Sequence, residues 1–332
     1  MRSKKLIILS VVVILIAAGI FLRNEVFQKD KIHRRTRFLM GTYCTIQAAG
    51  QRRHAITSID HALDRMEEVD VKFNPINSQS EIYKFNTNKE PITDKEIIDL
   101  LAVSQQISRA SSGAFDCSVQ PLISLWGFYG DEPSLPEKKQ VDECLKNVGF
   151  RNIRIVENKL VSSIDSSGID LGGIAKGYAV GEAVKVLKKQ GIKSALIDAG
   201  GDIYALGKLK NRGWKVGIRN PRGEGIIGAV EISDLAVVTS GDYEQYFEQD
   251  GLRYHHIFDP RTGYPARGLA SVTVVSPDPT CADAWSTALF VLGEEKSMTI
   301  VENTPDLEAV IITNEGKIYH SSGLDDSFKI TN

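Results

Sequence analysis

The feature that most constrains the fold is a pair of adjacent glycines between a strand-like segment and a helix-like one. The stretch reads Ile169-Asp170-Leu171-Gly172-Gly173-Ile174-Ala175-Lys176-Gly177-Tyr178. Glycine lets a ligand approach the backbone closely, and the first turn of a helix presents unpaired N–H groups at the positive end of its dipole. The stretch therefore predicts either a tight strand-to-helix turn or an anion site. It is not a P-loop, because no serine or threonine follows Lys176.

The composition is that of a globular chain. Of 332 residues, 42% are hydrophobic and 25% are charged, and the net charge is -2. Such a chain supports a large core, as one big domain or two intimate lobes, and offers no broad basic surface to nucleic acid. The four cysteines have no CxxC spacing, which argues against a zinc ribbon or a disulfide scaffold and leaves a single disulfide open.

The N-terminus carries a membrane-targeting pattern. Three basic residues precede an uncharged apolar run from Leu6 to Leu22. As a helix this run would be roughly 25 Å long, close to the lower limit for crossing a bilayer. The positive charge predicts that the N-terminus stays inside and that the rest of the chain is exported. We expect a single-pass signal anchor in the cell membrane over residues 1–23, a linker over 24–36 and an extracytoplasmic domain over 37–332. The alternative is a cleaved signal peptide, with small residues at 17–19.

The exported part is expected to form an α+β domain. Apolar residues recur every three or four positions from His54 to Val69, which predicts an amphipathic helix. Further helices are predicted from about Thr93 to Ser111 with a Thr93/Glu96 capping box, from about Ser134, from Lys176 to Lys189, and from a Thr280 N-cap through Phe290. Strands are predicted over 37–46 with an interruption at Gly41, over 194–206 with a split at Gly200-Gly201, and over 214–219, 226–232 and 236–238. Strands that follow one another through turns, with helices grouped elsewhere, favour largely antiparallel sheets.

Three common enzyme motifs can be set aside. A G-x-G-x-x-G string covers residues 223–228, but strand-like residues follow it where a dinucleotide fold needs a helix. The sequence has neither the G-x-S-x-G elbow of many serine hydrolases nor the H-E-x-x-H pattern of zinc proteases. A Rossmann oxidoreductase is therefore disfavoured.

Three polar groups indicate chemistry. The pair His255-His256 precedes an Asp-Pro turn, which places an imidazole at the end of a strand as a general base, although packed or surface histidines are commoner. Asp283 and Thr287 share one helix face, and their oxygens suit Mg²⁺, with helix capping as the plainer interpretation. Asp116 would accept hydrogen bonds from a heterocycle or cap a neighbouring element.

Seven sequence blocks occur in order between Phe38 and Tyr319. They are Met40-Gly41-Thr42; Ser80-Glu81-Ile82 with Asn86; Phe115-Asp116 with Pro121-Leu122; Asp170 to Gly177; Asp198-Ala199-Gly200-Gly201-Asp202; His256 to Gly263; and Asp283 to Thr287. In these blocks the chain resembles the FAD:protein FMN transferases, the ApbE family. The resemblance implies an ApbE-like, T-fold-like arrangement of antiparallel sheets and packed helices.

The resemblance also implies an activity and a set of site residues. The activity is Mg²⁺-dependent transfer of FMN from FAD to a threonine or serine of an acceptor protein, such as an exported redox or electron-transport subunit, with release of AMP. By position, the FAD site would comprise Met40, Phe73, Ala114, Phe115, Asp116, Asp170, Lys176 and Ile257. The main-chain oxygen of Gly173 with Asp283 and Thr287 would hold the metal, and His256 would be the catalytic base. Some relatives carry an acidic residue in place of Ser286. The alternatives are an FAD pyrophosphatase that uses water as the acceptor and a flavin-binding protein without chemistry.

Overall fold

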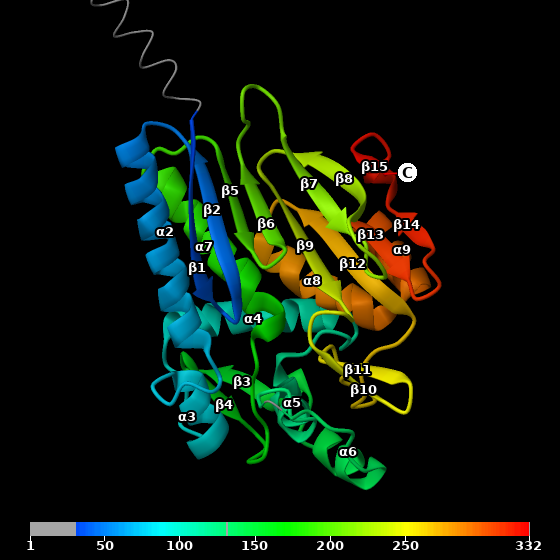
Figure 1. Cartoon of the computed structure of the whole chain (residues 1–332). Coiled ribbons are helices and arrows are strands. Elements are labelled where there is room, and N and C mark those ends of the chain that lie inside the picture. Colours follow the sequence, from blue (N-terminus) through cyan, green and yellow to red (C-terminus); the bar gives the residue numbers. More distant parts are fainter. Residues whose placement is uncertain (1–30, 131, 332) are drawn as a thin grey trace, which may run out of the picture.

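A long antiparallel sheet forms the centre of the molecule (Figure 1). The structure is a computed structural model that describes residues 31–130 and 132–331. Within these ranges the sheet has eight strands, and every neighbouring pair is antiparallel. In spatial order they are β1 (Ile32–Leu39), β2 (Thr42–Ala49), β5 (Ala195–Ala199), β6 (Asp202–Leu206), β9 (Leu235–Gly241), β12 (Leu269–Ser276), β13 (Glu308–Thr313) and β14 (Ile318–His320). The expected α+β class with antiparallel sheets is confirmed.

Helices cover one face of this sheet (Figure 1). They are α2 (Arg52–Phe73), α7 (Gly172–Lys189) and α8 (Pro279–Leu292), with α4 (Lys95–Ala110) beyond them and α9 (Glu294–Glu302) after α8. The apolar stripe predicted on α2 is buried in the main core through Ile59, Leu63 and Met66. This packing confirms the amphipathic helix and fixes the start of α7 beside the end of α2.

A second, smaller sheet covers part of the other face. It contains β7 (Trp214–Arg219), β8 (Ile226–Ile232) and β15 (Phe328–Ile330) in the order β15-β8-β7. Trp214 and Val230 pack in one apolar cluster with Val275 of β12 and Val310 of β13. The 223–228 string lies in the turn and first residues of β8, so the structure agrees that it is no dinucleotide loop.

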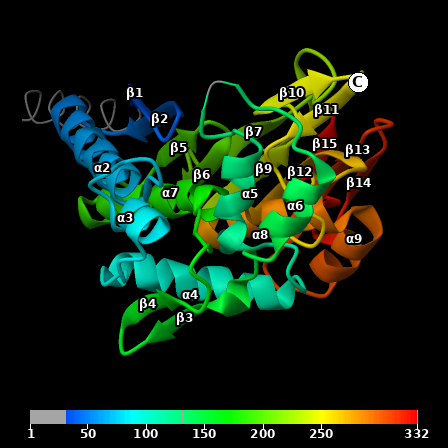
Figure 2. The same ribbon diagram turned by 90° about the horizontal axis from the view of Figure 1, so that it is seen from below.

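A smaller lobe lies beyond one end of the main sheet, as Figures 1 and 2 show. It contains α3 (Glu81–Asn88), α5 (Gln120–Leu125), α6 (Lys138–Leu145) and two hairpins, β3 (Ile153–Val156) with β4 (Lys159–Ser162) and β10 (Tyr246–Gln249) with β11 (Leu252–His255). Short 3₁₀ turns lie at Cys117–Val119, Phe150–Asn152 and Ser322–Leu324. The fully buried Trp126 packs against Tyr254 and Phe258 and donates its indole N–H to the carbonyl of Gly263 at 3.0 Å. This contact ties the β10–β11 hairpin to α5.

The first strand differs from the sequence expectation. Residues 37–46 are not one interrupted strand but parts of β1 and β2, joined by a two-residue turn. Met40 and Gly41 have φ angles of 51° and 71°, the left-handed backbone that matches hairpin twist. The strand also begins at Ile32, so the last residues of the range expected as a linker belong to the sheet.

The predicted starts of four helices also differ from the structure. For α4 and α8, several residues that can cap a helix lie close together. The N-cap of α4 is Asp94, which accepts hydrogen bonds from two backbone N–H groups, whereas Thr93 bonds Glu81. The N-cap of α8 is Asp278 rather than Thr280, since Pro279 already occupies the first helical turn. The other two predicted starts are also wrong: α6 begins at Lys138, and α7 begins at Gly172 rather than Lys176. Asp94 and Asp278 each accept hydrogen bonds from two backbone N–H groups, and aspartate ranks above threonine as an N-cap residue.

The predicted anchor over residues 1–23 lies outside the described residues. Within residues 31–130 and 132–331, no helix combines the length and the apolar character that a membrane crossing requires. The four cysteines are free thiols, with Cys44 and Cys117 buried and Cys144 and Cys281 partly exposed.

Candidate functional site

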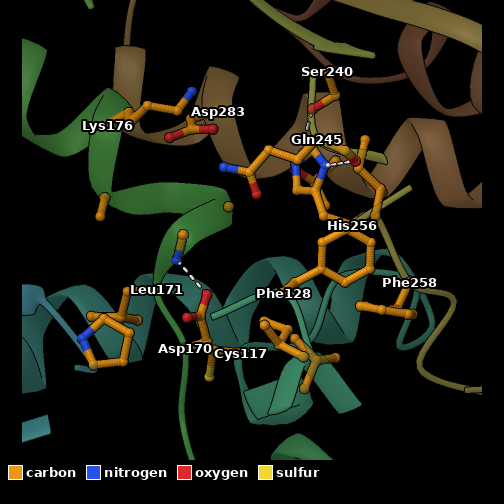
Figure 3. A pocket seen from close by; sticks show the side chains of 18 of the residues that line it. Cys117, Phe128, Asp170, Leu171, Lys176, Ser240, Gln245, His256, Phe258 and Asp283 are labelled. Atoms are coloured by element: carbon orange, nitrogen blue, oxygen red, sulfur yellow. Dashed lines mark hydrogen bonds between the residues drawn. The ribbon is translucent and has the colours of Figure 1, made fainter. Parts of the chain in front are cut away.

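A cavity of about 400 Å³ is lined by the β1–β2 turn, the ends of α2 and β9, the start of α7, one face of α8, and residues between 114 and 129 and between 256 and 260. Figure 3 shows part of this wall. All site residues that the family resemblance implies line it: Met40, Phe73, Ala114, Phe115, Asp116, Asp170, Gly173, Lys176, His256, Ile257, Asp283 and Thr287. Residues spread over most of the domain are therefore brought to one place.

The glycine pair opens α7 directly on the cavity. Asp170 accepts a hydrogen bond from the N–H of Gly172 at 2.7 Å and another from the hydroxyl of Tyr129 at 2.6 Å. Burial raises the pKa of Asp170, and these two donors oppose the shift. Tyr129 also lines the cavity and was not predicted from the sequence. Residues 163–171 form no strand, so the expected strand-to-helix turn is wrong, and α7 begins on the cavity after an irregular segment.

Lys176 supplies a fixed positive charge. Its Nζ lies 2.5 Å from Oδ2 of Asp202, a carboxylate whose side chain is 1% exposed. Burial lowers the pKa of Lys176, but the nearby carboxylates of Asp202 and Asp283 raise it above its ordinary value, so the ammonium stays protonated. The other oxygen of Asp202 is buried and has no hydrogen-bond partner among the described residues. Asp202 lies in the Asp198 to Asp202 block but was not predicted as a site residue.

Oxygen atoms gather where α8 meets α7. Oδ2 of Asp283 accepts a hydrogen bond from the N–H of Gly177 at 2.8 Å, and Thr287 Oγ1 lies 3.3 Å from Ser240 Oγ. A Cβ atom on Gly173 would lie 3.2 Å from Thr287 Oγ1, so the Gly173 backbone lies against that hydroxyl. Burial, with the negative charge of Asp202, raises the pKa of Asp283 to about 7. The residues predicted to hold a cation are therefore together.

Ser286 is fully buried and donates to the main-chain oxygen of Asp283 at 2.8 Å. Ser240 Oγ lies 2.7 Å from the same hydroxyl. Ser286 is thus hydrogen-bonded within the fold. In the described ranges, no group of at least three His, Cys, Asp or Glu side chains is arranged to hold a metal ion. A cation at this site would therefore also need hydroxyl and main-chain oxygens as ligands.

His256 has the geometry of a general base. Its Nδ1 lies 3.2 Å from the main-chain oxygen of Gln245, which also accepts the His256 backbone N–H at 3.1 Å (Figure 3). A carbonyl can only accept, so Nδ1 carries the proton and Nε2 keeps its lone pair. Burial lowers the pKa of His256 to about 4, and the ring is therefore neutral at physiological pH.

The neighbouring His255 has a structural role instead. Its Nε2 lies 2.8 Å from the main-chain oxygen of Ala266, and its Nδ1 accepts the N–H of Ile257 at 3.2 Å. The ring also packs edge-on against Phe290. Both ring nitrogens of His255 are hydrogen-bonded within the fold. Of the two adjacent histidines, His256 is therefore the candidate base.

Asp116 lines the cavity, but its carboxylate is used within the fold. Oδ1 accepts hydrogen bonds from the backbone N–H and hydroxyl of Ser118, and Oδ2 accepts the N–H of Phe150, all at 2.7–2.8 Å. Of the two roles considered for Asp116, the structure shows the capping one. It holds residues 116–118 against the 3₁₀ turn at Phe150.

Comparison with known proteins assigns the chain to a family. Residues 40–311 match the model of the ApbE family. The FAD:protein FMN transferase of Treponema pallidum is 32% identical over 89% of this chain and 88% of its own length. The enzyme of the same name from Vibrio cholerae is 35% identical over 80% and 82%. The crystal structure of an ApbE protein from Thermotoga maritima superposes with a TM-score of 0.84 at 34% identity, over 89% of this chain and 98% of that one. The chain therefore belongs to the ApbE family.

Proposed function

We propose that this protein transfers FMN from FAD to a serine or threonine hydroxyl of an acceptor protein and releases AMP. The relatives that it matches are named FAD:protein FMN transferases. The observation that carries the proposal is the neutral imidazole of His256, whose Nε2 keeps its lone pair in the same cavity as the ammonium of Lys176. Such a transfer needs a base that takes the proton of the alcohol and positive charge that binds the phosphate oxygens.

His256 acts on the acceptor hydroxyl. As the hydroxyl oxygen attacks the phosphorus of the FMN half, Nε2 takes the proton, and a new oxygen–phosphorus bond forms. The phosphorus–oxygen bond to the AMP half breaks, and AMP leaves with that electron pair. General-base catalysis of this kind contributes roughly 10²–10⁴-fold. Lys176 binds phosphate oxygens and holds the phosphorus in place, while Asp202 keeps Lys176 charged.

We also propose a Mg²⁺ site formed by the main-chain oxygen of Gly173 and the side chains of Asp283 and Thr287. The donors are hard oxygens, as Mg²⁺ prefers. The pKa of Asp283, raised to about 7, indicates a carboxylate buried among negative charges, and a nearby cation would relieve that repulsion. When bound, Mg²⁺ neutralises charge on the pyrophosphate.

The test is incubation of the purified protein with FAD and MgCl₂, with and without a flavin-acceptor domain from an exported electron-transport subunit. The proposal predicts AMP together with flavin that stays attached to the acceptor after denaturation, and neither with an acceptor whose target threonine is changed to alanine. AMP without attached flavin identifies an FAD pyrophosphatase. Bound FAD without AMP identifies a flavin-binding protein.

The membrane anchor over residues 1–23 and the extracytoplasmic location stay proposals, supported by the charge and length of the N-terminal apolar run. Cell fractionation with protease added to intact spheroplasts tests them. An anchored extracytoplasmic domain stays with the membrane pellet and is digested from outside. A protein that is protected from the protease overturns the proposed location.

A further inference from the structure

The oxygen that bonds the His256 ring belongs to a turn rather than to a regular element. Residues 242–245 connect β9 to β10, and the main-chain oxygen of Gln245 ends this turn. The tautomer of His256 therefore depends on where the turn is held, because a carbonyl that moved away would leave both tautomers open to the ring.

Asp242 anchors the start of this turn. It is 6% exposed, and its N–H donates to the main-chain oxygen of Ala270 at 3.1 Å. Arg222 binds its carboxylate with two parallel hydrogen bonds, from Nη1 to Oδ1 at 2.8 Å and from Nη2 to Oδ2 at 2.6 Å. Paired bonds of this kind fix geometry as well as supply energy. Arg253 of β11 approaches the same carboxylate at 3.6 Å.

The second sheet supplies another contact to the same turn. The guanidinium of Arg219 lies 5.0 Å from the centroid of the Tyr243 ring. Arg219 ends β7, and Arg222 lies in the turn between β7 and β8. No residue from 214 to 232 lines the cavity. The β7–β8 hairpin thus contacts the turn that carries Gln245 without contacting the cavity itself.

We propose that Arg222, through Asp242, is a positioning residue that holds the Gln245 carbonyl at Nδ1 of His256 and so selects the tautomer with a free Nε2. The role of Nε2 as a base rests on the proposed function. The assignment of the proton to Nδ1 rests on the hydrogen bond to Gln245 and is independent of that function. The competing explanation is that the β10–β11 ladder suffices, since Tyr246 pairs with His255 and the next bond joins Gln245 to His256.

The test measures the tautomer directly, by nitrogen-15 NMR of protein labelled at histidine, with the His256 signals assigned from their loss in His256→Gln. Wild type should show one neutral form with the proton on Nδ1. Arg222→Gln should show a mixture of both tautomers. It should also lower kcat for AMP release at least about tenfold while the KM for FAD stays within about twofold. Lys215→Gln is the matched control, because Lys215 lies on the same hairpin and is exposed.

Arg222→Lys keeps the charge but cannot form both bonds, so it should give an intermediate mixture, and it decides the matter if Arg222→Gln does not fold. A single Nδ1–H form and an unchanged kcat in both Arg222 variants would overturn the proposal and leave the ladder as the cause. A shifted tautomer in a protein whose wild type transfers no FMN would instead refute the proposed function and keep this inference.

Discussion

Gly177 allows α7 and α8 to approach at the point where Asp283 is held. A Cβ atom at position 177 would lie 2.1 Å from the main-chain oxygen of Pro279 and 2.6 Å from Cβ of Asp283. Both are far inside van der Waals contact, and the closest atom is backbone, which cannot rotate away. Gly177→Ala should therefore push the two helices apart.

Two effects of opposite sign decide the result. Alanine favours a helix interior over glycine by about 1 kcal/mol, which would stabilise α7. Overpacking a close-packed contact costs about 1–3 kcal/mol, and a backbone neighbour places this site at the upper end. The net expectation is a loss of about 1–2 kcal/mol in the free energy of unfolding.

Gly181, one helical turn later on α7, gives a matched control. A Cβ atom there would lie 3.4 Å from Cγ of Pro279, an ordinary contact. Gly181→Ala should therefore gain about 0.5–1 kcal/mol. Urea denaturation of both variants measures these differences in the free energy of unfolding. Gly177→Ala should also need a higher Mg²⁺ concentration for half-maximal activity, because Asp283 is displaced. A Gly177→Ala variant as stable as wild type would refute this account of the α7–α8 contact.

Three further predictions concern the site. Burial lowers the pKa of His255 and His256 to about 4, so these two rings contribute stability that is lost as the pH falls from about 6.5 towards 4, whereas Asp283, with its pKa raised to about 7, acts in the opposite direction. The urea midpoint should therefore fall more between pH 7 and pH 5 in wild type than in His256→Gln, and an equal change in the two proteins contradicts this. Asp283→Ala should abolish the response of activity to Mg²⁺, and a variant that still responds fully would remove Asp283 from the metal site. Tyr129→Phe removes a donor from the partly buried Asp170 and should cost about 1–3 kcal/mol in the free energy of unfolding, whereas a thermal melt like that of wild type would show that the bond contributes nothing.

The sequence was a good guide where one dominant signal acts. The period of apolar residues predicted the helix α2, because burial of an apolar stripe has few competing solutions. The paired glycines at 200–201 predicted a break in a strand, and the structure has the turn between β5 and β6 there. It failed where nearby residues compete for one role. Met40 and Gly41 form the turn between two strands where one interrupted strand was expected, and Asp278 caps α8 in place of Thr280.

The site residues carried over from the family resemblance all line one cavity, but their partners did not follow from the sequence. Asp202 of strand β6 binds Lys176 of helix α7, and Tyr129 binds Asp170 from the smaller lobe. The link from Arg222 to Asp242 joins two sheets. These are contacts between residues far apart in the chain, and no local periodicity or capping pattern encodes them.

The most direct test of the central claim is a single-turnover measurement of flavin transfer by wild type and His256→Gln at saturating FAD and Mg²⁺. Intact-mass spectrometry of the acceptor should show the gain of one FMN less one water, with an equal amount of AMP. The account predicts that His256→Gln binds FAD like wild type and forms this adduct roughly 10²–10⁴-fold more slowly. Equal rates, or equal loss of FAD binding and transfer, would contradict the role of His256 as the base.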